Sequence, residues 1–197
     1  MHNCTPNDLH APIAAAALRA GKHVICEKPL ALSVPEAEPL IALAAESGLT
    51  VAVPFVYRYH PLVREAQARV LGGALGRVRL IHGSYLQDWL SSPADNNWRV
   101  DVTRGGPSCA FADIGSHWCD LVEFVSGQRL TRLIAQTVIA VPERVDVLRR
   151  ETLRVSGEDA RVRMETEDIA TLLFLPTVDG WTPEGCRQSS MDCARSR

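Results

Sequence analysis

A strand–helix–strand unit near the start of the chain constrains the fold more than any other feature. The apolar run His23–Cys26 precedes a helix signature at Ser33–Glu36, a capping box with a proline in the first helical turn. That helix is expected to end before Gly48, and a second apolar run, Leu49–Val53, follows at once. Since connections this short build a right-handed crossover, the sequence predicts a parallel sheet.

The remaining elements indicate an α/β protein whose later part differs in character from its start. An alanine-rich helix is expected over Leu9–Ala20, closed by Gly21. The further expected elements are helices over Pro61–Leu71 and Asp113–Ser126, strands over Arg77–Gln87, Leu130–Val141 and Val162–Leu175, and a polar loop over Ser91–Ser108 that is too long for a plain connector.

Composition excludes several classes of protein. A length of 197 residues corresponds to one or two domains, and a net charge of -2 gives no reason to expect nucleic-acid binding. No apolar run approaches the roughly 20 residues that span a bilayer, and the first residues lack a signal-peptide pattern. We therefore expect a cytoplasmic protein without membrane or nucleic-acid partners. Six cysteines are expected to be free thiols: Cys4, Cys26, Cys109, Cys119, Cys186 and Cys193.

Lysine is a rare choice in this chain, so its positions matter. Of the 21 basic residues only Lys22 and Lys28 are lysines, and Lys28 lies in the segment Cys26–Pro29 at the carboxyl end of a predicted strand. Ligands of parallel sheets collect outside such strand ends, where an amine can donate hydrogen bonds to a substrate oxygen. A solvated surface turn is the alternative, and spacing alone leaves both open.

A second candidate group lies on the predicted helix over Asp113–Ser126. Asp113 and His117 share one face, with Asp120 one turn further, and a carboxylate beside an imidazole raises the basicity of that imidazole. The structural alternative makes Asp113 the N-cap and His117 a half-buried, hydrogen-bonded histidine. A metal site built from all three side chains is the weakest interpretation, because no second cluster completes a familiar spacing.

Two further segments carry groups suited to binding. The loop contains Asn97–Arg99 and the glycines Gly105 and Gly106, and an arginine beside a tryptophan either binds a phosphate, stacks on a ring or anchors the loop. Tyr57–Pro61 stands where the two patterns of the chain meet, which is where a cleft between domains is expected.

Taken together, these motifs resemble those of the Gfo/Idh/MocA oxidoreductases, the family of glucose–fructose oxidoreductase and inositol dehydrogenases. The resemblance runs in the family's order from Asn3 to Leu175. Its motifs are Thr5-Pro6-Asn7 with His10, Ala20–Ala31 with its Glu-Lys-Pro, Tyr57-Arg58, and Ala112–His117.

The resemblance implies a fold and a division of the chain. Residues 1–56 would form the C-terminal part of a dinucleotide-binding Rossmann domain with a parallel sheet. Residues 57–175 would form an incomplete α+β domain with an open, mostly antiparallel sheet, which binds substrate and joins subunits, so a homo-oligomer is expected. Residues 176–197 match nothing in the family, and their lack of Leu, Ile and Phe predicts a disordered tail.

The resemblance also implies a reaction: hydride transfer between NAD or NADP and a hydroxyl-bearing carbon of a sugar, inositol or related polyol, without a metal. His117 would be the acid/base, with Lys28 and Asp113 orienting the hydroxyl. The residues expected along the cofactor are Thr5, Pro6, Asn7, His10, Glu27, Lys28, Arg58, Trp98 and Arg99.

One departure from the family limits this expectation. Gly-x-Gly-x-x-Gly, which grips the pyrophosphate, does not occur in the chain. We therefore expect a fragment with negligible NAD(P) affinity that is inactive alone. The alternatives are a non-catalytic binding or assembly module derived from the same fold and a metal-dependent sugar isomerase or hydrolase.

Overall fold

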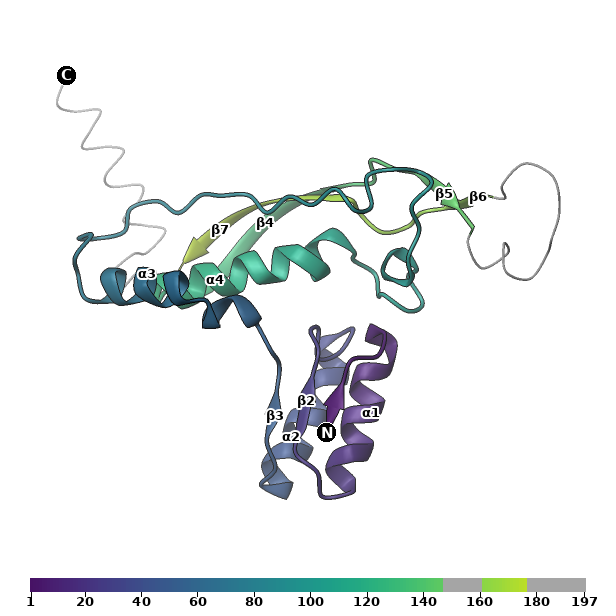
Figure 1. The fold of residues 1–197 in the computed structure, drawn as a ribbon, viewed down its shortest axis with the longest axis horizontal. Coiled ribbons are helices and arrows are strands. Elements are labelled where there is room, and N and C mark those ends of the chain that lie inside the picture. Colours follow the sequence, from purple (N-terminus) through teal and green to yellow (C-terminus); the bar gives the residue numbers. More distant parts are fainter. Residues whose placement is uncertain (147–160, 177–197) are drawn as a thin grey trace.

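A small parallel sheet with two helices forms the first part of the protein. The computed structural model describes residues 1–146 and 161–176, and the tail prediction for 176–197 falls almost entirely outside these ranges. The sheet has the order β1-β2-β3 and is parallel throughout (Figure 1). Its elements are β1 (His2–Asn3), α1 (His10–Arg19, after a 3-10 turn over Asn7–Leu9), β2 (Val24–Cys26), α2 (Val34–Ser47) and β3 (Val51–Ala52).

The predicted crossover unit is confirmed, and its core explains why these residues form it. Ala14, Leu18 and Val24 are buried together with Leu40, so both helices pack on the same face of the sheet. Small alanines on α1 let that helix approach the strands closely. The two-residue strand β1 was not predicted, because so short a segment carries no periodicity.

The helix cap on α2 differs in detail from the predicted capping box. Ser33 is the N-cap residue, but its side chain makes no capping hydrogen bond. Glu36 does reach back, and its carboxylate accepts from the backbone N–H of Leu32 at 3.2 Å. The helix ends as predicted at Gly48, whose φ of 64° is left-handed.

The later part of the chain lies beyond the carboxyl ends of β1–β3 and is built from helices under a two-stranded ribbon (Figure 1). The strands β4 (Leu130–Val138) and β7 (Ile169–Pro176) pair antiparallel, as do β5 (Glu143–Val145) and β6 (Arg161–Arg163). The helical elements are η2 (Val56–Tyr59), α3 (Pro61–Leu71), η3 (Trp98–Val100), a π-helical turn η4 (Phe111–Gly115) and α4 (Ser116–Ser126).

Two element predictions in this part need correction. The helix expected from Asp113 begins earlier, at Phe111, with a π turn, so Asp113 lies inside the turn and is not the N-cap. The single strand expected over Val162–Leu175 is divided into β6 and β7. The chain between these strands is buried at Thr166 and Glu167, which are 2% and 7% exposed, because it packs under the long loop.

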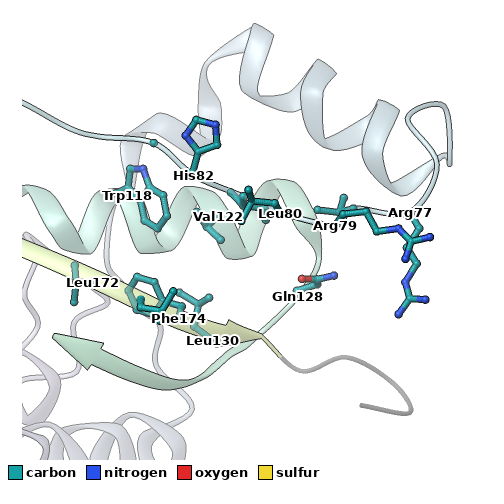
Figure 2. Close-up of a pocket in the computed structure, with 14 residues that line it drawn as sticks. Arg77, Arg79, Leu80, His82, Trp118, Val122, Gln128, Leu130, Leu172 and Phe174 are labelled. Atoms are coloured by element: carbon teal, nitrogen blue, oxygen red, sulfur yellow. The ribbon is translucent and has the colours of Figure 1, made fainter. Parts of the chain in front are cut away.

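The strand predicted over Arg77–Gln87 is wrong. This segment is extended, but it pairs with none of the described strands, since β4 and β7 pair with each other. A pocket of about 530 Å³ separates it from β7, lined also by Trp118 of α4 (Figure 2). Trp118 stacks on Phe174 across the pocket floor with ring centroids 5.9 Å apart. Leu80 and Leu86 are 77% and 84% exposed, so the segment's alternation buries no apolar face.

None of the helices within residues 1–146 and 161–176 has the length and apolar character of a membrane span. Cys4, Cys26, Cys109 and Cys119 are free thiols, as predicted. Cys186 and Cys193 lie outside the described residues.

Candidate active site

Lys28 and Asp113 meet at the carboxyl end of β2. The Lys28 ammonium lies 2.5 Å from Asp113 Oδ1 and 2.8 Å from the Asp113 backbone oxygen. Their side chains are 13% and 22% exposed, so the pair is largely withdrawn from water but still reachable. The fold thus brings together two groups that are 85 residues apart in the sequence.

His10 is buried between the segment after β1 and the segment after β2. Its imidazole is 1% exposed, with Nδ1 2.6 Å from the Pro29 carbonyl oxygen and Nε2 2.8 Å from the Thr5 carbonyl oxygen. Both ring nitrogens therefore lie against backbone carbonyl oxygens, and the expectation that His10 lies along the cofactor stays a prediction. The histidine instead ties the segment after β1 to the segment that carries Lys28.

The segment after β1 is fixed by a second polar contact and reaches the long loop. Buried Asn3 accepts from the Thr5 hydroxyl at 2.8 Å and donates to the His10 carbonyl at 3.1 Å. Asn7 donates to the Gly105 carbonyl at 2.8 Å. Thr5, Pro6 and Asn7 thus line the end of β1 beside half-buried Glu27, at the edge where a parallel sheet binds ligands.

His117 lies in an aromatic enclosure next to Lys28 and Asp113. Its ring centroid is 4.8 Å from that of Tyr57 and 5.8 Å from that of Phe55, both in edge-to-face arrangement. Its Nδ1 is buried and has no hydrogen-bond partner among the described residues. Burial, and next the Lys28 charge, lower the pKa of His117, while Asp113 acts in the opposite sense. The imidazole is therefore held in its neutral, proton-accepting form.

Arg58 and Asp120 form an ion pair beside the aromatic enclosure of His117. Arg58 Nε lies 2.9 and 2.8 Å from the carboxylate oxygens of Asp120, which is 9% exposed. This hydrogen-bonded carboxylate raises the pKa of Arg58. The pair joins η2 to α4, and the expectation that Arg58 also lies along the cofactor stays a prediction. Because Asp113 and Asp120 each hold a cation side chain, and no three ligand side chains gather within the described ranges, the geometry does not support a metal site.

The long loop folds back so that Arg99 approaches Asp113, with Trp98 beside the Arg99 guanidinium. The Arg99 guanidinium lies 4.5 Å from the Trp98 ring centroid and 5.6 Å from that of Trp89, and its Nε is 3.7 Å from Asp113 Oδ1. Gly105 allows this return, since a Cβ there would lie 2.3 Å from the Arg99 carbonyl oxygen.

Sequence reasoning missed a polar strip beside this group. The hydroxyl of Tyr57 lies 2.5 Å from that of Tyr85, Gln87 donates to Tyr85 at 3.2 Å, and the Trp89 indole donates to Gln87 at 2.8 Å. The hydrogen bond to Tyr57, and next burial, raise the pKa of Tyr85 to about 12. Their spacing at alternate positions of one extended segment was the signal that could have found Tyr85, Gln87 and Trp89.

An amine, a carboxylate and a neutral imidazole in one half-buried group can together take a proton from a hydroxyl and stabilise the charge that develops on its oxygen. Aromatic rings and amide groups on the adjoining strip add surface for a polar ring.

Two family models match the chain. "GFO/IDH/MocA C-terminal domain" matches residues 63–175, and "Oxidoreductase family, NAD-binding Rossmann fold" matches residues 4–55. Levoglucosan dehydrogenase of Pseudarthrobacter phenanthrenivorans is 40% identical over 63% of this chain and 32% of its own length. Myo-inositol dehydrogenase Hyg17 of Streptomyces leeuwenhoekii is 28% identical over 89% of this chain and 49% of its own.

Solved structures agree with these matches. The oxidoreductase domain protein from Kribbella flavida has a TM-score of 0.79 and 40% identity, covering 89% of this chain and 46% of that one. Levoglucosan dehydrogenase in complex with NADH and levoglucosan has a TM-score of 0.75 and 31% identity, covering 88% and 43%. The chain spans between 32% and 49% of the length of the curated relatives described above. With a family model over 63–175 and another over 4–55, the chain belongs to the Gfo/Idh/MocA oxidoreductase family.

Proposed function

We propose that the protein to which this chain belongs transfers a hydride between NAD or NADP and a hydroxyl-bearing carbon of a sugar, inositol or related polyol. The observation that carries this proposal is the meeting of Lys28, Asp113 and His117 at the carboxyl end of β2. Relatives named for levoglucosan and myo-inositol support the substrate class.

The residues present fit a nicotinamide cofactor in part. Thr5, Pro6 and Asn7 after β1 and Glu27 and Lys28 after β2 would hold it, since they follow adjacent parallel strands. When bound, the cofactor supplies the acceptor for the hydride.

His117 takes the hydroxyl proton in this proposal. Its Nδ1 is enclosed, so we assign the transfer to Nε2. The lowered pKa keeps the ring neutral before the reaction. Lys28, held by Asp113, donates to the substrate oxygen and stabilises the negative charge that grows there as the proton leaves.

The polar strip favours a ring with several hydroxyls over a simple alcohol. Tyr57, Tyr85 and Trp89 contribute aromatic rings to this strip and Gln87 an amide, and the Arg99 guanidinium lies over the Trp89 ring. Apolar faces of a sugar ring pack on aromatic side chains while its hydroxyls find polar partners. A short aliphatic substrate would leave these polar groups without partners, which is unfavourable.

The test joins this chain to the glycine-loop half of a relative and follows reduced nicotinamide in the presence of sugars and polyols. We expect turnover with at least one cyclic polyol or sugar by the joined protein, and negligible cofactor affinity for the chain alone. A well-folded joined protein that binds reduced cofactor but turns over no member of the panel would contradict the proposal. Micromolar binding of reduced cofactor to the chain alone would contradict the second expectation.

The partner of this chain, we further propose, is a second copy that packs on the outer face of the β4–β7 ribbon. Ile134 and Leu173 pair across the two strands and are 72% and 63% exposed. Val138 and Ile169, the next pair but one on this face, are 44% and 50% exposed. Two exposed apolar pairs on one sheet face, here on either side of the polar Gln136–Thr171 pair, are typical of subunit contacts.

Ile134→Glu is expected to weaken this self-association by about 10-fold or more, because it buries a charge in an apolar contact. Sedimentation velocity over a concentration series measures the dissociation constant of this self-association. Leu80→Glu is the matched control, since Leu80 is 77% exposed but lies outside the ribbon. A monomeric parent chain, or equal effects of both variants, would contradict the proposed contact.

A further inference from the structure

Glu167 occupies a buried position between β6 and β7, far in sequence from the residues that it contacts. Its side chain accepts hydrogen bonds from the Ser108 hydroxyl at 2.7 Å and from the Phe111 backbone N–H at 2.9 Å. The residue is 7% exposed. A carboxylate is rarely buried to this degree unless it is hydrogen-bonded, so these contacts define its place.

Glu167, together with the Ser108 that it contacts, accepts hydrogen bonds from the backbone N–H groups at the beginning of the η4–α4 helix. Its backbone oxygen accepts from the Ala110 N–H at 3.1 Å, and Ser108, which it holds, accepts from the Ala112 N–H at 3.3 Å. The first N–H groups of a helix have no partner within the helix and are ordinarily satisfied by a residue just before it. Here a residue 56 positions later does so.

We propose that Glu167 is a positioning residue that fixes the turn carrying Asp113 and, one turn later, His117. The turn over Phe111–Gly115 is π-helical, a wider form that is rare and found mostly at functional sites. Its width sets the direction in which Asp113 meets Lys28 and the direction in which His117 enters its aromatic enclosure. Only the description of these groups as catalytic depends on the proposed function.

The experiment reads the surroundings of His117 directly by an NMR pH titration of its ring in the full chain. The groups that face this ring are Lys28, Asp113, Asp120, Glu27, Phe55 and Tyr57, and none of them is changed. In Glu167→Ala the titration midpoint should rise by about half a unit or more, toward an ordinary imidazole, because loosening of the turn admits water and separates Lys28 from the ring.

Two matched variants separate positioning from a general loss of stability. Glu167→Gln keeps an oxygen that accepts from Ser108 and Phe111, so it should retain the parent midpoint. Glu165→Ala removes an exposed carboxylate two residues away and should leave the midpoint unchanged. Ser108→Ala removes one contact of the same group and should raise the midpoint by a smaller amount, which provides the test if Glu167→Ala fails to fold.

The outcomes are decisive in either direction. A folded Glu167→Ala or Ser108→Ala protein with the parent midpoint overturns the proposal, as does a shift in Glu167→Gln as large as that in Glu167→Ala. Since neither cofactor nor substrate is present, the titration succeeds or fails independently of whether the protein is a dehydrogenase.

Discussion

Replacing His117 with glutamine is expected to lower the rate of hydride transfer by about 10²- to 10⁴-fold in the protein completed with a glycine-loop half. Glutamine keeps polar atoms in the enclosure formed by Phe55 and Tyr57, so the fold should persist. It cannot accept a proton near neutral pH, so the substrate hydroxyl would have to release its proton to water. The measurement is the single-turnover rate of nicotinamide reduction at saturating substrate.

His117 is also expected to determine how the rate of alcohol oxidation depends on pH. Burial and the nearby Lys28 charge lower the pKa of His117 below its usual value near 6.5. Oxidation of the alcohol requires the neutral ring, so the parent rate should be retained down to that lowered pKa and fall below it. In His117→Gln this decline should disappear.

The exposed histidine at position 82 provides the control. His82→Gln changes the same side-chain type outside the aromatic enclosure, and we expect no effect on the rate or on the pH profile. A His117→Gln protein that retains the parent rate, or that retains the acid limb, would remove the assigned role of His117.

The sequence indicated the candidate catalytic groups because each lies at a recognisable place in a local element. Lys28 follows a strand that ends at Cys26, and Asp113 and His117 share one helical face. What the sequence did not contain is the contact between them. The 2.5 Å Lys28–Asp113 contact depends on how the later part of the chain lies over the sheet, and no local pattern encodes that placement.

Two of the residues predicted along the cofactor have polar partners in this chain that the sequence did not indicate. His10 and Arg58 belong to motifs whose position along the chain is informative, but a motif does not state which neighbour takes a polar atom. The Thr5 and Pro29 carbonyls occupy His10, and Asp120 occupies Arg58. Such partners are determined by tertiary packing, which is invisible in one sequence.

The polar strip was missed for a related reason. A strand was predicted over Arg77–Gln87, a range that ends before Trp89, and this segment pairs with none of the described strands. A period of two indicates an extended backbone, but it does not specify which strand, if any, pairs with that segment. A pocket lined by Trp118 lies between this segment and β7 (Figure 2).

Arg144→Met is expected to lower the free energy of unfolding by about 3–5 kcal/mol, the largest stability effect that we predict. Arg144 is 0% exposed. It donates to the Ser92 and Asp95 carbonyls at 3.0 and 2.9 Å and pairs with Asp168 at 2.7 Å. Methionine fills much of the volume but leaves a partly buried carboxylate and two carbonyls without their donor. Urea denaturation followed by tryptophan fluorescence measures the change.

Arg163, an exposed arginine on β6 opposite Glu143, provides the control for this prediction. Arg163→Met removes the same charge at a nearby position and should change the free energy of unfolding by about 0.5 kcal/mol or less. Adding Asp168→Asn to Arg144→Met should recover part of the loss, because the carboxylate left behind causes much of the cost. Equal effects of Arg144→Met and Arg163→Met would show that the buried arginine contributes through charge alone, contrary to the geometry.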